Sequence, residues 1–106
     1  MIGVLDRTHF AHMTGGDRAL QLEIIALFRS QASGWDIEFS NPSTEWRAAA
    51  HMAKGSARGI GLATLALACE TAESASNFAN AAALAHLRAE LGEALAALEK
   101  FAAEER

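Results

Sequence analysis

The clearest pattern of hydrophobic and polar positions lies near the end of the chain. Apolar residues recur there in alternating steps of three and four, at Leu84, Leu87, Leu91, Ala94, Leu98 and Phe101. This spacing places them on one side of an α-helix, as a narrow seam suited to packing along other helices. The sequence therefore predicts a long amphipathic helix from Ala81 to Glu104.

A second stripe, also stepping by three or four residues, predicts another long helix earlier in the chain. Its members are Leu20, Ile24, Leu27, Phe28, Gln31, Trp35 and Phe39. We expect Trp35 and Phe39 to extend the core. Asp17 follows Gly15-Gly16 and is a candidate N-cap, because its carboxylate can accept hydrogen bonds from the amides of the first turn. Ser33-Gly34 lies inside the stripe and is expected to loosen the helix there.

Breaks in the pattern separate three further helices. They are expected over about residues 6–13, 44–57 and 62–76. Pro42 precedes the middle one, which Ser43 or Thr44 can cap. Gly59-Ile60-Gly61 then ends it. The last of the three carries an apolar side made of Leu62, Leu65, Cys69 and Ala72.

Composition supports a helical fold. Of 106 residues, 25 are alanine and 12 are leucine, against one valine and five isoleucines. Alanine is the best helix former, whereas strands prefer β-branched residues. Four long amphipathic helices with short connections predict an all-α protein, an antiparallel four-helix bundle with a short extra N-terminal helix. A chain of this length has room for one domain, spanning residues 1–106.

Charge and cysteine content argue against several functions. The 9 basic and 13 acidic residues give a formal charge of −4, which is unlike a nucleic-acid binder. Cys69 is the one cysteine, so it can form neither an internal disulfide nor a cysteine zinc site, and we expect it in the core. No apolar run approaches the ~20 residues of a membrane span, and the start does not resemble a signal peptide. We therefore expect a cytoplasmic protein without membrane contact, and a monomer, since no long exposed apolar seam demands a dimer.

Basic residues share one face of the helix expected after Pro42. They are Arg47, His51, Lys54 and Arg58, at offsets of 0, 4, 7 and 11. These offsets fall within a sector of roughly 60°, and Arg58 belongs to it only if the helix reaches that far. Glu45 is the only acid between Pro42 and Cys69, so nothing on this helix balances the charge near the histidine.

Small residues flank His51 on this helix. Ala48 lies about one turn before it and Gly55 about one turn after it. Glycine inside a helix costs ~1 kcal/mol relative to alanine, which suggests that something must come close to the imidazole. An imidazole with bare flanks and basic neighbours suits a small anion or a phosphoryl group. The same features also fit a histidine without chemistry on a solvated basic face.

The string from His51 to Gly61, HMAKGSARGIG, resembles the signature of histidine-containing phosphotransfer (HPt) domains. The family pattern is roughly H-x-L-K-G-[SA]-[SA]-x-x-[LIV]-G-A, followed by an apolar-patterned helix that ends in a glutamate, here Glu73. Residues 46–50 resemble the family's approach to its histidine, and Gly15-Gly16-Asp17 resembles its usual start. The resemblance covers most of the chain, with its specific part between residues 46 and 73.

Three positions depart from this family pattern. Ala53 and Ala72 stand where leucine is common, and Leu62 stands where alanine is usual. We hypothesise that Leu62 fills the volume vacated at Ala53. A rise in stability on Ala53→Leu, with no change at Leu62, would contradict this hypothesis.

The resemblance implies a mechanism. His51 would accept a phosphoryl group from a receiver-domain phosphoaspartate, at the distal nitrogen Nε2. It would then pass the group to the aspartate of another receiver in a bacterial multistep phosphorelay. A neutral imidazole is a competent nucleophile near neutral pH. Lys54 would offset phosphate charge, and Gly55 would leave room for the receiver to dock.

Further residues are expected to contact the partner: Arg47, Met52, Ser56, Arg58, Phe10 and Met13. The two arginines would steer an acidic receiver face toward the site. Phe10 and Met13 can form an apolar docking surface, because the family's first helix lies close to that end of the bundle. Simple capping of the core is an equal alternative for both.

The protein would be a phosphocarrier and not an enzyme, because its Gly-Ile-Gly cluster lacks the context of a phosphate-cradling nucleotide loop. It would need no cofactor of its own. The Mg²⁺ of the reaction would be held by the receiver, since no carboxylate cluster accompanies His51. Expected partners are receiver domains of hybrid histidine kinases and response regulators. His9 and His12, with only Asp6 nearby, are too few ligands to predict a metal site.

Two other functions remain open at this point. A helical adaptor would bind receivers without accepting phosphate, although the presence of both His51 and Lys54 speaks against it. Alternatively, a separate kinase catalytic domain would phosphorylate the histidine from ATP. The source of the phosphate, a phosphorylated receiver or ATP with a kinase, distinguishes these functions.

Overall fold

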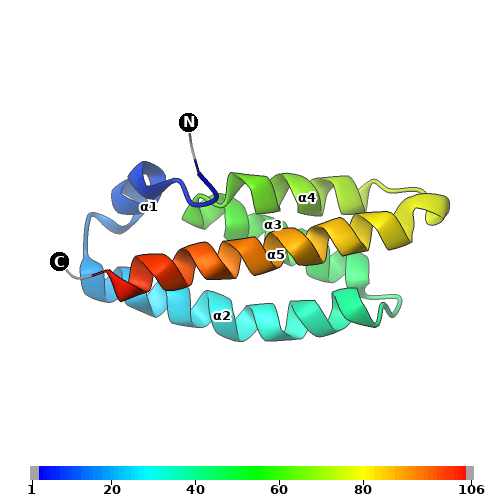
Figure 1. The fold of residues 1–106 in the computed structure, drawn as a ribbon, viewed down its shortest axis with the longest axis horizontal. Helices are drawn as coiled ribbons and strands as arrows, with labels where there is room; N and C mark the ends of the chain where they lie inside the picture. Colours follow the sequence, from blue (N-terminus) through cyan, green and yellow to red (C-terminus); the bar gives the residue numbers. More distant parts are fainter. Residues whose placement is uncertain (1–2, 105–106) are drawn as a thin grey trace.

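The chain folds into five α-helices and one short 3-10 turn, seen in a computed structural model that describes residues 3–104 (Figure 1). The elements are α1 (Arg7–Thr14), α2 (Arg18–Ser40), α3 (Trp46–Ile60), α4 (Ala63–Glu73), η1 (Asn77–Ala79) and α5 (Asn80–Ala103). No strand occurs within residues 3–104, so the predicted all-α class is confirmed. None of the helices in this part of the chain combines the length and the apolar character needed to cross a membrane.

Helices α2 to α5 form an elongated antiparallel bundle, in which each packs against its neighbours in the cyclic order α2, α3, α4, α5 (Figure 1). Helix α1 lies at one end, against the junction of α3 and α4. There the Asp6 amide donates to Gly61 O at 2.8 Å, and His9 Nε2 lies 3.0 Å from Gly59 O. At Gly61, where φ is +102°, a Cβ would lie 3.0 Å from Asp6 O, so only glycine allows both the turn and this close approach. The predicted four-helix bundle with an extra N-terminal helix is confirmed.

The core follows two of the predicted apolar patterns closely. The buried residues of α5 are Leu84, Leu87, Leu91, Ala94, Leu98 and Phe101, the whole predicted seam. Leu62, Leu65, Cys69 and Ala72 are likewise fully buried. Burial, together with the nearby Glu73 charge, raises the pKa of the Cys69 thiol to about 12, so Cys69 is an inert core residue as predicted. Ala53 and Leu62 are both sealed from solvent, and their compensation stays a prediction.

The buried side of α2 differs from the predicted stripe. It consists of Gln21, Ile25, Phe28, Ala32, Trp35 and Phe39. Leu20 and Leu27 lie on the surface instead, because the true stripe is rotated by one residue, or about 100°, over the first half of the helix. Gln21 disguises that stripe, but its amide donates to Thr14 Oγ1 at 3.0 Å and is thereby satisfied inside. The helix continues through Ser33-Gly34 without the expected loosening.

The ends of the helices confirm one predicted cap and correct others. The Asp17 carboxylate caps α2 as predicted. Ser43 and Thr44 do not cap α3, which begins at Trp46. The Ser43 hydroxyl instead donates to the Glu38 carboxylate at 2.7 Å. This side chain therefore ties the loop back to the end of α2.

Two further boundaries shape the functional region. Helix α3 continues to Ile60, beyond the predicted end at Ala57, because helical backbone persists up to the left-handed glycine that follows. The longer helix therefore carries Arg58. Helix α4 ends at Glu73, earlier than the predicted Ser76, so this glutamate lies at the C-terminal end of a helix.

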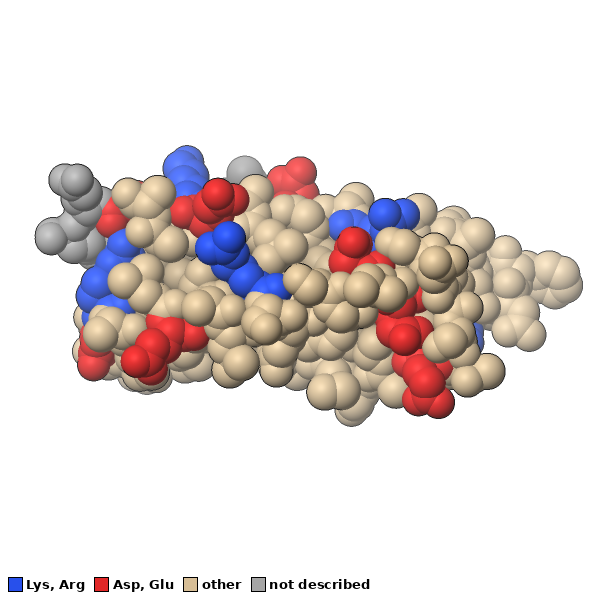
Figure 2. Space-filling model, turned by 90° about the horizontal axis from the view of Figure 1, so that it is seen from below, with Lys and Arg blue, Asp and Glu red and all other residues tan. Residues whose placement is uncertain are grey.

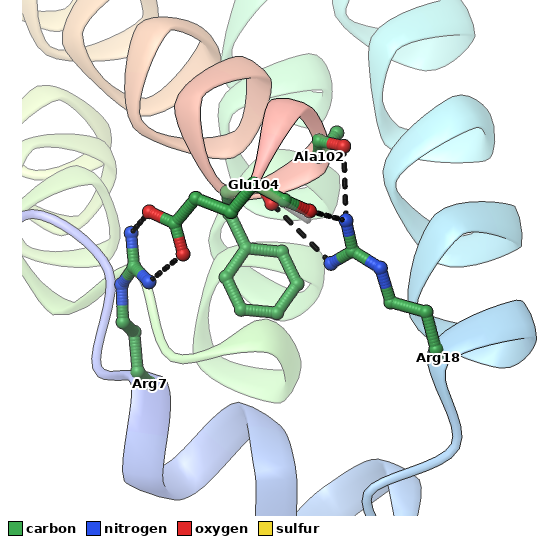
Figure 3. Close-up of polar contacts among 5 residues, drawn as sticks. Arg7, Arg18, Ala102 and Glu104 are labelled. Atoms are coloured by element: carbon green, nitrogen blue, oxygen red, sulfur yellow. Dashed lines mark hydrogen bonds and ion pairs between the residues drawn. The ribbon is translucent and has the colours of Figure 1, made fainter. Parts of the chain in front are cut away.

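Arginines from α1 and α2 hold the end of α5 (Figure 3). Arg18 donates to the backbone oxygens of Phe101, Ala102 and Glu104 at 3.3, 2.9 and 2.7 Å, at the end of the helix, where carbonyls run out of amide donors from a following turn. Arg7 binds the Glu104 carboxylate through both terminal nitrogens, at 2.6 and 2.7 Å. The two guanidinium carbons lie 5.2 and 5.1 Å from the centroid of the Phe101 ring. We call Arg7, Arg18, Phe101 and Glu104 the C-terminal clasp.

Candidate functional site

Helix α3 separates a buried side rich in alanine from an exposed polar side. Its buried residues are Trp46, Ala50, Ala53, Ala57 and Ile60. The small alanine side chains let neighbouring helices pack close to α3. His51 and Lys54 lie about one turn apart on the polar side, where both reach α4 at Glu73. The candidate site is therefore formed between two helices that are adjacent in the chain and in the bundle.

Glu73 joins the two basic residues of this site. Its Oε2 lies 3.0 Å from His51 Nδ1, and its Oε1 lies 2.7 Å from Lys54 Nζ. The His51 side chain is 70% exposed, whereas the Lys54 side chain is only 15% exposed. The buried Oε1 has no well-aligned hydrogen-bond donor among the described residues, so the ion-pair attraction of Lys54 is what stabilises it. Glu73 thus binds a mostly buried Lys54 side chain through one oxygen and a mostly exposed His51 ring through the other.

The charge state of Glu73 follows from these contacts. Burial alone would raise the pKa of the Glu73 carboxyl, but the Lys54 ammonium and the His51 ring more than offset this, so the pKa lies below its ordinary value. An ionised carboxylate only accepts hydrogen bonds, so the 3.0 Å contact assigns the proton of the neutral imidazole to Nδ1. Nε2 then keeps its lone pair, on an exposed ring that is held in orientation. The arrangement can present this nitrogen to an electrophile.

Basic residues of α3 are balanced by carboxylates from a neighbouring helix. Arg58 Nη2 lies 3.3 Å from the Glu70 carboxylate, and Lys54 is paired with Glu73. Arg47 turns away from His51, toward the connection between α4 and α5. The helix itself carries no balancing acid near His51, as the sequence predicts, and the balancing carboxylates come from α4.

An apolar groove lies beyond His51 along α3, between α1, α2 and α3. It is lined by Met13, Ile24, Leu27, Phe28, Gln31, Ser56, Gly59 and Ile60, none of them charged. Of the residues predicted to contact a partner, Met13 and Ser56 line this groove and Met52 is 61% exposed. Gly55 faces open space, since an added Cβ would meet nothing within 4 Å. Seen from the side of α2, the lower part of the molecule has an uncharged area between two groups of acidic side chains (Figure 2).

The structure corrects the surface role predicted for Phe10. Its side chain is fully buried, and its ring packs edge-on against Phe101 with the centroids 5.3 Å apart. The alternative, capping of the core, therefore describes Phe10. Met13 lies on the next turn of α1 and is 45% exposed, so it remains on the surface.

Other histidines are placed away from this site. Among residues 3–104, no group of three His, Cys, Asp or Glu side chains could hold a metal ion. His9 contacts the backbone of Gly59 and helps attach α1 to the end of α3. His86 is exposed on α5.

Glu73 and Leu27 are the residues whose roles sequence reasoning missed. The sequence pattern includes Glu73 as the closing glutamate of the motif. Its contact with His51 across 22 residues, however, depends on how α4 folds back after Gly61. Leu27 belongs to the predicted core stripe, yet it is 61% exposed and lines the groove. The rotation of α2 about its axis, which the buried Gln21 disguises, moves it to the surface.

The described residues thus place one exposed imidazole, that of His51, against the Glu73 carboxylate on an antiparallel four-helix bundle. The structure is similar to the crystal structure of histidine phosphotransferase ShpA from Caulobacter crescentus, with a TM-score of 0.81 and 33% sequence identity. The match covers 94% of this chain and 91% of that chain. The chain therefore belongs to the histidine-containing phosphotransfer family, which confirms the resemblance seen in the sequence. No sequence-family model and no curated protein matches it.

Proposed function

We propose that this protein is a phosphocarrier of a bacterial multistep phosphorelay. His51 accepts a phosphoryl group from the phosphoaspartate of one receiver domain and passes it to the aspartate of another. Family membership supports the phosphotransfer itself. The observation that carries the assignment to His51 is the 3.0 Å contact between its Nδ1 and Glu73, on a ring that remains exposed.

The chemical step follows from the proton on Nδ1. The Nε2 lone pair forms the N–P bond while the P–O bond of the acyl phosphate breaks, and the receiver aspartate leaves as a carboxylate. Nδ1 keeps its proton throughout, so the phosphorylated ring becomes cationic and Glu73 offsets that charge. Transfer to the second receiver reverses the step: its aspartate attacks phosphorus, the N–P bond breaks and a neutral imidazole is regenerated.

Lys54 stabilises the phosphoryl group in this proposal. A phosphoryl group carries about −1.5 to −2 charge at pH 7. The Lys54 ammonium lies 2.7 Å from Glu73 and about one turn from His51 on the same helix. Its long stem lets the ammonium move from the carboxylate toward the phosphate. Glu73 therefore keeps the Lys54 ammonium close to the His51 ring before the phosphoryl group binds.

The receiver docks over Gly55 and the neighbouring apolar groove. Gly55 leaves space above α3, while Met13, Leu27 and Met52 offer exposed apolar surface. The Mg²⁺ that supports the reaction is held by carboxylates of the receiver in this proposal. The chain transfers phosphate between partners and does not use ATP itself.

The test is transfer from a phosphorylated receiver. A ³²P-labelled receiver domain is mixed with the protein and Mg²⁺, and label on this chain is followed for the wild type, His51→Gln and His86→Gln. His86 is exposed on α5 and serves as the matched histidine control. We expect acid-labile, base-stable label on the wild type and on His86→Gln, and none on His51→Gln.

Three outcomes would contradict the proposal. Label that persists on His51→Gln would place the phosphate elsewhere. Receivers that bind without transferring phosphate, across a panel, would favour a helical adaptor. Label that arrives from ATP with a kinase catalytic domain, and not from receivers, would favour a kinase-phosphorylated histidine domain.

A further inference from the structure

Arg47 connects three parts of the bundle near the functional site. Its Nη2 donates to Ala75 O at 2.8 Å, just beyond α4, and to Asn80 Oδ1 at 3.0 Å, at the start of α5. Its guanidinium carbon lies 4.3 Å from the centroid of the Trp46 ring, which is itself buried. The side chain is half-buried, so it belongs to the structure of this end and not to a free surface.

The segment that Arg47 holds comes directly after Glu73. Helix α4 ends at Glu73, and Ala75 follows two residues later. The ends of helices fray, because their last carbonyls have no partners within the helix. Glu73 therefore lies between two attachments to α3: its own contacts with His51 and Lys54, and the Arg47 bond to Ala75.

We propose that Arg47 is a positioning residue for Glu73, and through Glu73 for the imidazole of His51. Arg47 fixes the chain just after α4, so that the Glu73 carboxylate stays within reach of Nδ1. Its own charge is used within the fold and does not attract a partner. The consequence for phosphotransfer rests on the proposed function, whereas the coupling of Arg47 to Glu73 does not.

The chain offers a matched control for this inference in the C-terminal clasp. Arg18 also binds backbone oxygens at the end of a helix, and its guanidinium also lies over a buried aromatic ring. It does so at the end of α5, at the opposite end of the bundle from the connection between α4 and α5 (Figure 1). Arg18→Met therefore removes the same kind of anchor without touching the segment after Glu73.

The experiment compares Arg47→Met, Arg47→Lys and Arg18→Met with the wild type. Methionine keeps the apolar stem of arginine, and lysine keeps one donor for Ala75 O. The titration of the Glu73 carboxyl is followed by ¹³C NMR, and the tautomer of His51 by the ¹⁵N signals of its ring. Thermal unfolding shows that each variant is folded at the temperature of measurement.

We expect Arg47→Met to raise the pKa of Glu73 toward its ordinary value and to mix the Nδ1–H and Nε2–H tautomers of His51. Arg47→Lys should restore part of both signals, and Arg18→Met should change neither, even if it lowers the unfolding temperature as much. Wild-type signals in Arg47→Met would overturn the inference. Equal changes in Arg18→Met would also overturn it, because general loosening would then be the cause.

Phosphotransfer provides the second readout. We expect Arg47→Met to slow transfer from a phosphorylated receiver about tenfold, as loss of a group that orients a reactive ligand typically does. An unchanged rate, with Glu73 and His51 shifted as expected, would overturn the link to phosphotransfer. If the wild type itself accepts no phosphate, the proposed function fails, while the NMR comparison still decides whether Arg47 positions Glu73.

Discussion

Two carboxylates lie at the C-terminal ends of helices in this bundle, and comparing them separates structure from chemistry. The Glu104 carboxylate, just after α5, accepts hydrogen bonds from both terminal nitrogens of Arg7. Glu73, the last residue of α4, divides its oxygens between the ring of His51 and the ammonium of Lys54. A helix C-terminus disfavours negative charge, so both carboxylates need basic partners.

The difference lies in what those partners can do. Arginine does not lose its proton, and its planar fork matches both carboxylate oxygens, so the bond to Glu104 is fixed. An imidazole has a second nitrogen and exchanges protons near neutral pH, and a lysine ammonium moves on a flexible stem. The same kind of ion pair therefore fastens the fold at one end and prepares a reactive nitrogen on α3.

Of the substitutions at these two carboxylates and their partners, Glu73→Ala should have the largest effect on the rate of phosphotransfer. Without the carboxylate, the proton is no longer held on Nδ1 and the cationic phosphorylated ring loses its counter-charge. We expect the transfer rate from a phosphorylated receiver to fall roughly 10- to 100-fold. Glu70→Ala, one turn earlier on α4 and paired with Arg58, is the control and should retain nearly the full rate. Similar losses in both variants would assign the effect to net charge instead.

Lys54→Met tests the role of Lys54, the second basic residue that contacts Glu73. It removes the ammonium that lies 2.7 Å from Glu73 and that we assign to the phosphate. We expect transfer to slow about tenfold, equivalent to ~1.4 kcal/mol of lost charge stabilisation. The pKa of Glu73 should rise in the same variant, because the Lys54 contact helps lower it. A lower rate with an unchanged Glu73 titration would contradict the shared-carboxylate arrangement.

Acid pH should weaken the Glu73 attachment in a defined direction. The pKa of Glu73 is lowered in the folded protein, so its contribution to stability is present above the ordinary glutamate value of about 4.3 and is lost as pH falls through the lower folded value. Wild type should therefore progressively lose its stability advantage over Glu73→Gln as the pH falls below the ordinary glutamate value of about 4.3. Denaturant unfolding across this range measures the difference. A stability difference between wild type and Glu73→Gln that does not change with pH would contradict the ion pairing of Glu73.

The smallest expected effect is that of the C-terminal clasp on function. The Arg7 and Glu104 side chains are largely exposed, and such pairs contribute about 0.5 kcal/mol. We expect Arg7→Met to lower the free energy of unfolding by about that amount and to leave the transfer rate unchanged. Loss of transfer in a stably folded Arg7→Met would show that the two regions are not independent.

The fold was predictable where apolar spacing was undisturbed. The seam of α5 is buried at every predicted position, since its helix packs with one narrow side inward. On α2 the apolar spacing predicts Leu20 and Leu27 on the buried side, although both are exposed. The pattern is misleading because Gln21, a polar residue, occupies one of the buried positions. Only the contact of its amide with Thr14, from another helix, explains that burial.

The sequence predicts which residues form the candidate site better than it predicts how their side chains contact one another. The motif singled out His51, Lys54 and Gly55, residues that share one helix and whose relative positions follow from helical geometry. It did not show that Arg47 turns to the connection after α4, or that Glu73 balances the charge. Both depend on contacts between helices, and these are set by how α4 folds back on α3.

In the proposed mechanism, Glu73 holds the proton on Nδ1 of His51 and so leaves Nε2 to carry the phosphate. The most direct test is NMR of the phosphorylated, ¹⁵N-histidine-labelled protein, in which coupling to ³¹P identifies the substituted nitrogen. We expect phosphate on Nε2 of His51, with a proton retained on Nδ1. Phosphate on Nδ1, or on a residue other than His51, would contradict it.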